Sequence, residues 1–228
     1  SHIDAWVFDL DNTLYPADCN LFGQIDARMA TYVRRLLGCG EAEARRLQKH
    51  YYVKYGTTMS GLMREHHVSP RDFLDYVHDI DHSVVAPNPA LADAIAALPG
   101  RRYIFTNGSV KHAETVAGRL GLAALFDAVF DIEAANYTPK PHRETYDRFV
   151  AAHGVAPARA AMFEDLAHNL QSAFDLGMTT VLVASGAAWI ADEPAGKRPA
   201  RPGESHPHVH HVTDDLAGFL GGAVLAAA

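Results

Sequence analysis

Short apolar runs separated by segments of helical length recur along this sequence, and this alternation limits the fold more than any other feature. The first run, Ala5 to Phe8, has four apolar residues in a row, as expected of a strand buried on both faces of a parallel sheet. Similar runs occur at 102–105, 128–130, 160–163 and 179–183, with a weaker candidate at 209–213. Helical patterns lie between the runs. The alternation predicts an α/β fold with a doubly wound parallel sheet.

One interval breaks this rhythm. About 90 residues separate the first run from the next core strand, whereas a strand-to-helix connection normally takes about 2–6 residues. Apolar residues at spacings of three and four predict helices within the interval, and Ser69-Pro70 has the form of a helix start. We therefore expect a helical-bundle cap at residues 17–86, inserted into an α/β core built from residues 1–16 and 87–228. The cap should cover the carboxyl edge of the sheet, where open α/β sheets hold ligands.

Composition excludes several classes of protein. The chain has 228 residues, of which 48% are hydrophobic and 21% charged, a balance typical of globular domains. A formal net charge of −7 gives no overall basic field for a nucleic-acid polymer. No apolar run approaches the length of about 18 residues that a membrane span needs. We expect a cytoplasmic protein with no membrane partner, whose two cysteines, Cys19 and Cys39, stay reduced. The sequence leaves the oligomeric state open.

Two polar segments follow the first two strands of the predicted core. Asp9 and Asp11 come directly after the first strand, and strand alternation would send both to one side. Carboxylates this close repel unless a cation lies between them or one of them holds a proton. Thr106, Asn107 and Gly108 follow the second strand and offer a hydroxyl, an amide and backbone N–H groups to an anion. Taken singly, the first segment is at least as consistent with an acidic turn after a strand, and the second fits a plain capped strand-to-helix turn better than an anion site.

Two further segments complete the set. Lys140 lies between two prolines, which stiffen the backbone around its ammonium group. Glu164 and Asp165 follow the strand at 160–163, with Asn169 one helical turn further on. Paired acids can complete a Mg²⁺ shell, although an acidic first helical turn looks the same in sequence. All four segments occur in order, each at a strand end, and this combination predicts one site.

The combination resembles the haloacid dehalogenase (HAD) superfamily, with its Rossmann-like core. The D-x-D-x-T motif of that family matches Asp9 to Thr13, and its later motifs match Thr106, Lys140 and the pair Glu164-Asp165. The resemblance covers nearly the whole chain and includes the helical cap after the first motif. It implies a Mg²⁺-dependent enzyme acting on a small phosphorylated metabolite.

The resemblance also implies a role for each matched residue. Asp9 would attack phosphorus and form an aspartyl-phosphate, while Asp11 would act as general acid and base. Asp9, Asp11 through its carbonyl, and Asp165 would bind Mg²⁺, with Glu164 nearby. The phosphoryl oxygens would be held by Thr106, Asn107 and Lys140. An aspartate at position 11 favours a phosphatase or a phosphomutase over a dehalogenase.

Within the superfamily, the chain looks most like the pyrimidine 5′-nucleotidase branch. The resemblance lies in Asp-Asn-Thr-Leu-Tyr, which ends at Tyr15, and in the segment from Tyr55 to Leu62. In that branch the corresponding cap segment faces the active site, so Tyr15, Tyr55, Thr57 and Thr58 are candidate substrate residues, with Gly108 and Asn169 at the rim. A helix break with an N-cap would explain the same segment without a substrate.

Three functional alternatives stay open. A phosphomutase on the same scaffold would share every motif, and a phosphatase of another metabolite, such as a sugar phosphate or phosphoglycolate, would share the mechanism. A non-catalytic phosphate-binding module is a third class, which the intact motifs and the large insertion disfavour. The histidines between His206 and His211 raise the possibility of a metal site, but no cysteine or acid is arranged with them. The loop at 186–207 has no predicted role.

Overall fold

A single parallel sheet of six strands forms the centre of the molecule. The computed structural model describes residues 3–194 and 196–227. The strands follow the order β3-β2-β1-β4-β5-β6, and every neighbouring pair is parallel. Their bounds are β1 Ala5–Phe8, β2 Arg101–Phe105, β3 Ala128–Phe130, β4 Ala160–Glu164, β5 Thr179–Val183 and β6 His211–Thr213. This order is that of a doubly wound sheet, so the predicted fold class is confirmed.

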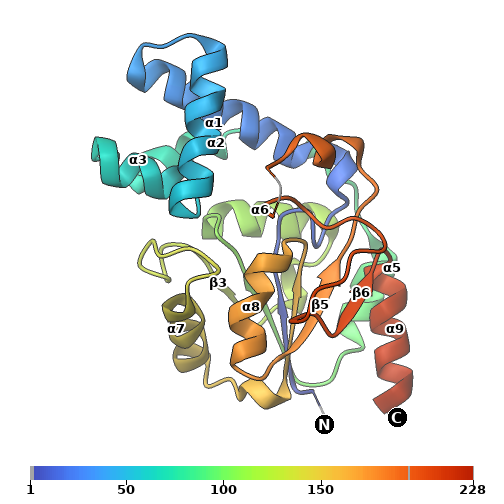
Figure 1. The fold of residues 1–228 in the computed structure, drawn as a ribbon. Helices are drawn as coiled ribbons and strands as arrows, with labels where there is room; N and C mark the ends of the chain where they lie inside the picture. The colour runs from blue at the N-terminus through green and yellow to red at the C-terminus, as the bar shows by residue number, and fades with distance from the viewer. Residues whose placement is uncertain (1–2, 195, 228) are drawn as a thin grey trace.

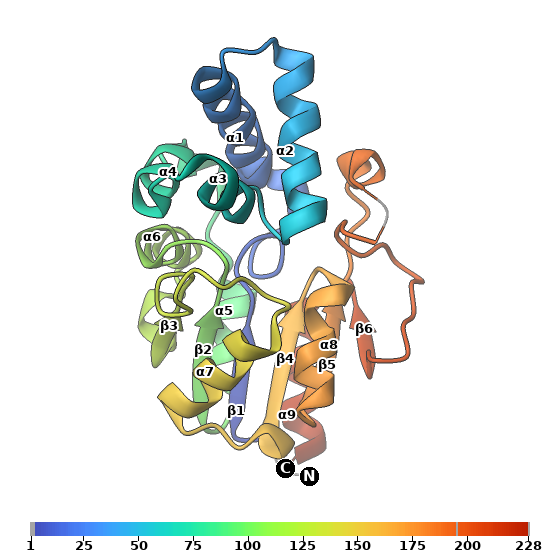
Figure 2. The ribbon, with the colours of Figure 1, turned by 60° about the vertical axis from the view of Figure 1, so that its left-hand side comes forward.

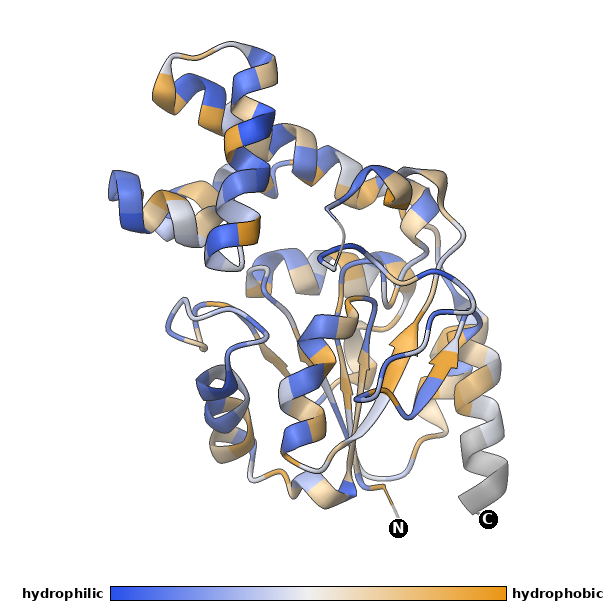
Figure 3. Cartoon of the chain, in the orientation of Figure 1, coloured by the Kyte–Doolittle hydropathy of each residue, from blue (hydrophilic) through white to orange (hydrophobic). Residues whose placement is uncertain are grey.

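Helices cover both faces of the sheet, as Figures 1 and 2 show. Residues of α5 (Pro89–Ala96), α6 (Val110–Leu120) and α9 (Leu216–Ala227) pack with one face of the strands in one hydrophobic cluster. Residues of α7 (Arg143–His153) and α8 (Ala167–Asp175) pack with the other face in a second cluster. Because both faces are covered, β1 is buried and apolar along its whole length, and the buried residues of β2 and β5 are mostly apolar; orange segments mark apolar strand residues in Figure 3.

The middle of the sheet is where the strand order reverses. Phe8 at the end of β1 is in register with Ile104 of β2 on one side and with Phe163 of β4 on the other. The rings of Phe8 and Phe163 stack with their centroids 4.6 Å apart. This register places Asp9 and Glu164, the next residues along each strand, side by side at the carboxyl edge. Ligands of doubly wound folds bind at this reversal point.

Four helices fill the long interval after β1. They are α1 (Leu21–Leu37), α2 (Glu41–Tyr55), α3 (Thr58–His66) and α4 (Pro70–Val77), and they share a hydrophobic cluster of their own. Figure 2 shows them beyond the carboxyl ends of the strands. Gly56, at φ 88°, breaks the chain between α2 and α3, a conformation that glycine adopts without steric cost. Ser69 caps α4 by accepting from Asp72 N, as predicted. The exact division at residues 16/17 and 86/87 stays a prediction.

The remaining connections are short 3-10 turns and loops. The 3-10 turns span Ala17–Cys19, His82–Val84, Ala123–Leu125, Pro157–Arg159 and Ala188–Asp192. The last of these lies in the loop between β5 and β6. Cys19 and Cys39 are both free thiols. Among the described helices, none has both the length and the apolar character that crossing a membrane requires.

Candidate active site

The four predicted motif segments meet at the carboxyl edge of the sheet. Asp9 follows β1, Thr106 follows β2, and Glu164 ends β4. Lys140 arrives from the loop before α7 and is 1% exposed, which is rare for a lysine without partners. Its ammonium nitrogen donates to Asp9 Oδ1 at 2.7 Å, to Glu164 Oε1 at 2.7 Å and to the Phe105 carbonyl at 2.8 Å. The lysine therefore ties three neighbouring strand ends together.

Glu164 is fully engaged in these contacts. In addition to Lys140, its Oε1 accepts from Asn169 Nδ2 at 2.7 Å, and its Oε2 accepts from the Leu166 backbone N–H at 2.9 Å. Burial raises the pKa of Glu164, but the Lys140 charge and these hydrogen bonds outweigh burial and leave the pKa lowered. Glu164 is therefore ionised and serves to orient Lys140.

The carboxyl groups of Asp9, Glu164 and Asp165 outnumber the one ammonium group that contacts them. Carboxylate oxygens of Asp9, Glu164 and Asp165 lie within 4.8 Å of one another, and all three residues are buried. Burial and the Glu164 charge raise the pKa of Asp9 to about 7 and also raise that of Asp165 well above its ordinary value. Three carboxylates face the single ammonium of Lys140. The cluster therefore has hard oxygen ligands and an excess of two negative charges when ionised, which fits a divalent cation such as Mg²⁺.

Asp11 does not belong to this cluster. Alternation along an extended strand predicted it on the same side as Asp9, but β1 ends at Phe8 and Asn12 turns the chain at φ 60°. Asp11 Oδ1 instead accepts from the Tyr15 hydroxyl at 2.7 Å and from His112 Nε2 at 3.0 Å. Burial raises the pKa of Asp11, but the His112 ring and the two hydrogen bonds together leave it lowered.

A group of histidines lies next to Asp11, and no sequence pattern indicated it. His112 is 1% exposed, and its Nδ1 lies 3.3 Å from His82 Nε2. The ring of His78 stacks on that of His112 with a centroid separation of 4.2 Å. Burial and the His112 ring lower the pKa of His78 to about 3, so His78 is neutral near pH 7. Since a carboxylate only accepts, His112 Nε2 donates to Asp11, and these rings fix the orientation of the carboxylate.

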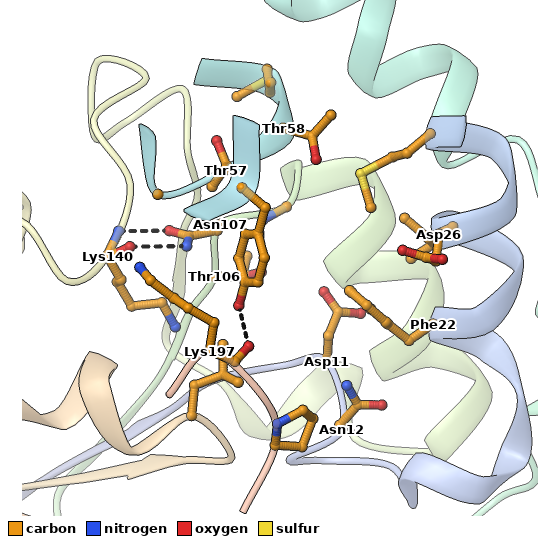
Figure 4. Close-up of a pocket in the computed structure, with 18 of the residues that line it drawn as sticks. Asp11, Asn12, Phe22, Asp26, Thr57, Thr58, Thr106, Asn107, Lys140 and Lys197 are labelled. Atoms are coloured by element: carbon orange, nitrogen blue, oxygen red, sulfur yellow. Dashed lines mark hydrogen bonds between the residues drawn. The ribbon is translucent and has the colours of Figure 1, made fainter. Parts of the chain in front are cut away.

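The predicted phosphate-binding residues lie beside Lys140. Thr106 is buried, and its hydroxyl oxygen accepts from the Gly108 backbone N–H at 2.9 Å, which leaves the hydroxyl proton free to donate. Asn107 binds the backbone of Lys140 by a pair of amide contacts drawn in Figure 4, of which the stronger joins Lys140 N to Asn107 Oδ1 at 2.8 Å. The Asn107 side chain therefore positions Lys140.

A cavity of about 180 Å³ connects this edge of the sheet with the inserted helices. Figure 4 shows Asp11 and Thr106 in its lower part, with Thr57, Thr58, Phe22 and Asp26 on the helical side. Its upper wall is largely apolar. The residues that form this apolar part come from α1, α3 and α4 and include Phe22, Ile25, Met29, Met59, Leu74 and Val77.

The candidate substrate residues divide into two sets. Thr57, Thr58, Gly108 and Asn169 line the cavity, and Thr57 is also the N-cap of α3, accepting from Ser60 N at 3.0 Å. Tyr15 and Tyr55 are not among the residues that line the cavity. Tyr15 is buried behind Asp11.

Tyr55 turns outward, where its hydroxyl donates to Glu65. The tyrosine that does line the cavity is Tyr52, one turn earlier in α2. Lys197, from the loop between β5 and β6, lines it as well, and its backbone carbonyl accepts from Tyr52 Oη at 2.6 Å.

The histidines near the C-terminal end of the chain have structural contacts. His208 Nε2 lies 2.7 Å from the Ala167 carbonyl, and His210 Nδ1 accepts from the Thr180 backbone N–H at 3.0 Å. Within residues 3–194 and 196–227, the one group arranged to hold a metal is Asp9, Glu164 and Asp165.

Matches to two family models agree with the geometry of this site. A family model described as haloacid dehalogenase-like hydrolase matches residues 3–177, and a second, described as HAD-hydrolase-like, matches residues 137–218. The chain belongs to the haloacid dehalogenase-like hydrolases.

A curated relative and several solved structures are similar to the chain. Phosphate metabolism protein 8 of Saccharomyces cerevisiae is 28% identical over 197 residues, which cover 78% of this chain and 60% of the relative. The chain thus spans about three fifths of that protein. Phosphate-bound CbbY from Rhodobacter sphaeroides is 18% identical, with a TM-score of 0.64 and coverage of 95% of this chain and 96% of the other.

Two further structures widen the comparison. L-2-haloacid dehalogenase from Xanthobacter autotrophicus is 19% identical, with a TM-score of 0.60 and coverage of 99% of this chain and 100% of the other. The HAD-hydrolase YfnB from Bacillus subtilis, bound to magnesium, is 13% identical, with a TM-score of 0.59 and coverage of 100% of this chain and 99% of the other. At these sequence identities the similarity establishes a shared fold, and proteins that catalyse different reactions share this fold.

Proposed function

We propose that this protein is a Mg²⁺-dependent phosphomonoesterase that acts through an aspartyl-phosphate on a small phosphorylated metabolite, with a pyrimidine nucleoside 5′-monophosphate as the first candidate. The observation that carries the proposal is the buried cluster of Asp9, Glu164 and Asp165 around Lys140, which has an unbalanced negative charge and opens into a cavity. An exposed or fully neutralised cluster would have no comparable need for a cation.

Asp9 is the proposed nucleophile. Its Oδ1 is held by Lys140, while its Oδ2 is contacted by the Thr13 hydroxyl at 3.2 Å. A carboxylate oxygen of Asp9 attacks phosphorus, the bond from phosphorus to the leaving oxygen breaks, and the phosphoryl group stays on Asp9. Lys140 and the Thr106 hydroxyl face the phosphoryl oxygens and offset their charge.

Asp11 is the proposed acid and base. It donates a proton to the leaving oxygen in the first step, then takes a proton from the water that attacks the aspartyl-phosphate, which releases phosphate and restores Asp9. The lowered pKa of Asp11 in the free protein suits the second role. For the first role, the negative charge of a bound phosphate raises the pKa of the adjacent carboxyl.

A magnesium ion fits the acidic cluster by charge and by ligand type. The side chains of Asp9 and Asp165 and the Asp11 carbonyl would bind the ion, with the Glu164 carboxylate nearby. When bound, the ion would neutralise phosphate charge and align the phosphoryl group for attack. The magnesium bound to the Bacillus subtilis structure and the phosphate bound to the Rhodobacter sphaeroides structure support this assignment.

The inserted helices are the proposed cap, residues 17–86 over a core of residues 1–16 and 87–228. Helices α1 to α4 supply the upper wall of the cavity, so a substrate bound to Asp9 would be enclosed by them. Enclosure excludes water and lets the wall select the leaving group. In this proposal the cap residues select the substrate, and the core residues carry out the reaction.

Phosphate release is the measurement that tests the proposal. The protein should release phosphate from UMP or CMP in the presence of Mg²⁺, and chelation of the metal should stop the release. A panel with sugar phosphates and phosphoglycolate identifies the preferred ester, and isomer formation without phosphate release would identify a phosphomutase instead. Asp9→Asn should abolish turnover, whereas Asp93→Asn, an exposed aspartate of α5, should not. Near-normal rates in Asp9→Asn would exclude Asp9 as the nucleophile.

A further inference from the structure

One buried oxygen in the wall of the cavity lacks a hydrogen-bond partner. Gln48 of α2 lines the cavity and is 1% exposed. Its amide nitrogen donates to Asp26 Oδ1 at 2.6 Å and faces the Asp26 carbonyl at 3.3 Å. These two acceptors fix the orientation of the amide, because a flipped amide would place its oxygen against a carboxylate. The remaining atom, Gln48 Oε1, has no partner in the described chain, and burial of an unpaired acceptor costs free energy.

The polar groups around Gln48 are already engaged with one another. Lys49 Nζ contacts Asp26 Oδ1 at 2.9 Å and both carboxylate oxygens of Glu193 at 2.7 and 2.9 Å. Thr58 donates its hydroxyl to the Gln48 carbonyl at 3.2 Å. The one cation of this wall is therefore held by carboxylates, and what the wall leaves available is an acceptor.

Many other side chains on the helical side of the cavity are apolar. They include Phe22, Ile25 and Met29 of α1 and Leu74 and Val77 of α4. An acidic group of a ligand would meet hydrocarbon and acceptors here, and its desolvation would have no compensation. Of the other lysines that line the cavity, Lys140 is bound by Asp9 and Glu164, and the ammonium nitrogen of Lys197 lies 5.7 Å from the centroid of the Tyr52 ring. No cation of the described residues contacts Gln48 Oε1.

We propose that Gln48 Oε1 accepts a hydrogen bond from an N–H group of the substrate's leaving group, so that the cavity selects a neutral heterocycle with an amide or amine donor over a leaving group that carries a second acid. The inference rests on the proposed phosphomonoesterase function, whose leaving group must occupy this part of the cavity. A pyrimidine base meets the requirement, since uracil presents the N3–H of its ring and cytosine presents an N–H of its exocyclic amine.

Binding to a form that cannot turn over separates this inference from the enzymatic one. Calorimetric titration of Asp9→Asn with UMP and with N3-methyl-UMP, in Mg²⁺, compares two ligands that differ at a single N–H. Loss of one hydrogen bond to a buried acceptor predicts a dissociation constant at least about tenfold higher for the methylated ligand. Phosphoglycolate, which has a second acid in place of the base, should bind more weakly than UMP.

The variant Gln48→Met, made in the same Asp9→Asn background, removes the acceptor and keeps the side-chain length. The two ligands should then bind within about twofold of each other. The matched control is Gln171→Met on the exposed face of α8, which should keep the preference. Circular dichroism confirms that the variants fold, and the comparison of ligands on Asp9→Asn alone does not depend on Gln48→Met folding.

Three outcomes would overturn the inference. These are equal dissociation constants for the two ligands on Asp9→Asn, a preference that survives Gln48→Met and so comes from steric exclusion of the methyl group, and tighter binding of phosphoglycolate than of UMP. If the expected binding pattern is found but wild-type protein releases no phosphate from UMP, the base-binding inference stands and the enzymatic proposal fails.

Discussion

Replacement of Asp9 by asparagine should stabilise the metal-free protein at alkaline pH while it removes activity. In the metal-free fold, burial and the neighbouring Glu164 carboxylate raise the pKa of Asp9 from 3.8 to about 7, against the opposing effect of Lys140. At about 1.4 kcal/mol for each pH unit between those values, the ionised carboxylate lowers the free energy of unfolding by about 4 kcal/mol.

The direction in which the free energy of unfolding changes with pH follows from proton binding. Because the pKa is higher in the folded chain, the folded protein binds more protons than the unfolded chain between pH 3.8 and about 7. The free energy of unfolding therefore falls as the pH rises through this interval, whereas below it both states hold the proton. Asparagine resembles the protonated carboxyl and cannot ionise. The free energy of unfolding of the variant therefore does not fall in this way as the pH rises. It also weakens the 2.7 Å contact with Lys140, which leaves an expected net gain of about 2–3 kcal/mol at pH 8.

Thermal unfolding after chelation measures this gain. For a chain of 228 residues the gain corresponds to a midpoint roughly 4–12 °C above wild type at pH 8, and the difference should shrink toward pH 4. Added Mg²⁺ should raise the wild-type midpoint more than that of Asp9→Asn, and Asp93→Asn should behave as wild type. A chelated Asp9→Asn protein that is no more stable than wild type at pH 8 would refute the reasoning, since the cluster would then carry no unbalanced charge.

Two further substitutions test other parts of the site. Lys140→Met should lower the free energy of unfolding by about 3–5 kcal/mol in urea titrations at pH 7, because Asp9 and Glu164 lose their shared cation; an unchanged urea midpoint would show that the lysine is not needed to hold these charges. His112→Ala should lower kcat by roughly tenfold to a hundredfold with little change in KM, because His112 contacts Asp11 and is not among the residues that line the cavity. A fall in kcat/KM that came entirely from KM would contradict this role.

The core of the site could be predicted because its signals are local. An apolar run identifies each buried strand, and the doubly wound topology then brings the strand ends to one edge. Asp9, Lys140 and Glu164 came together for this reason, although they are far apart in sequence. The strands at 128–130 and 179–183 were predicted with the bounds that the structure has.

The other residues of the site depend on which face of a helix each one occupies and on contacts between segments that are far apart in the sequence. Tyr52 and Tyr55 lie three residues apart on α2, and Tyr52 is the one that lines the cavity. No pattern marked His112, because its role arises only when α6 packs beside the turn after β1. Gln48 has no sequence signal either, since its significance is an atom left unpaired after folding.

The loop between β5 and β6 received no role from the sequence, yet it joins the core to the inserted helices. Lys49 of α2 pairs with Glu193 of this loop at 2.7 Å, and the Tyr52 hydroxyl donates to the Lys197 carbonyl at 2.6 Å. On the core side, Ala200 N donates to the Asp165 carbonyl at 2.8 Å. One segment thus contacts both the upper wall of the cavity and the backbone of a proposed metal ligand.

The strength of these contacts decides what the loop can do. A partly exposed ion pair contributes about 0–1 kcal/mol, and a neutral hydrogen bond about 0.5–1.5 kcal/mol. The ion pair and the hydrogen bond between α2 and the loop therefore contribute only about 2 kcal/mol together. The buried contacts of Lys140 with Asp9, Glu164 and the Phe105 carbonyl lie wholly within the core, so they do not depend on these contacts between α2 and the loop.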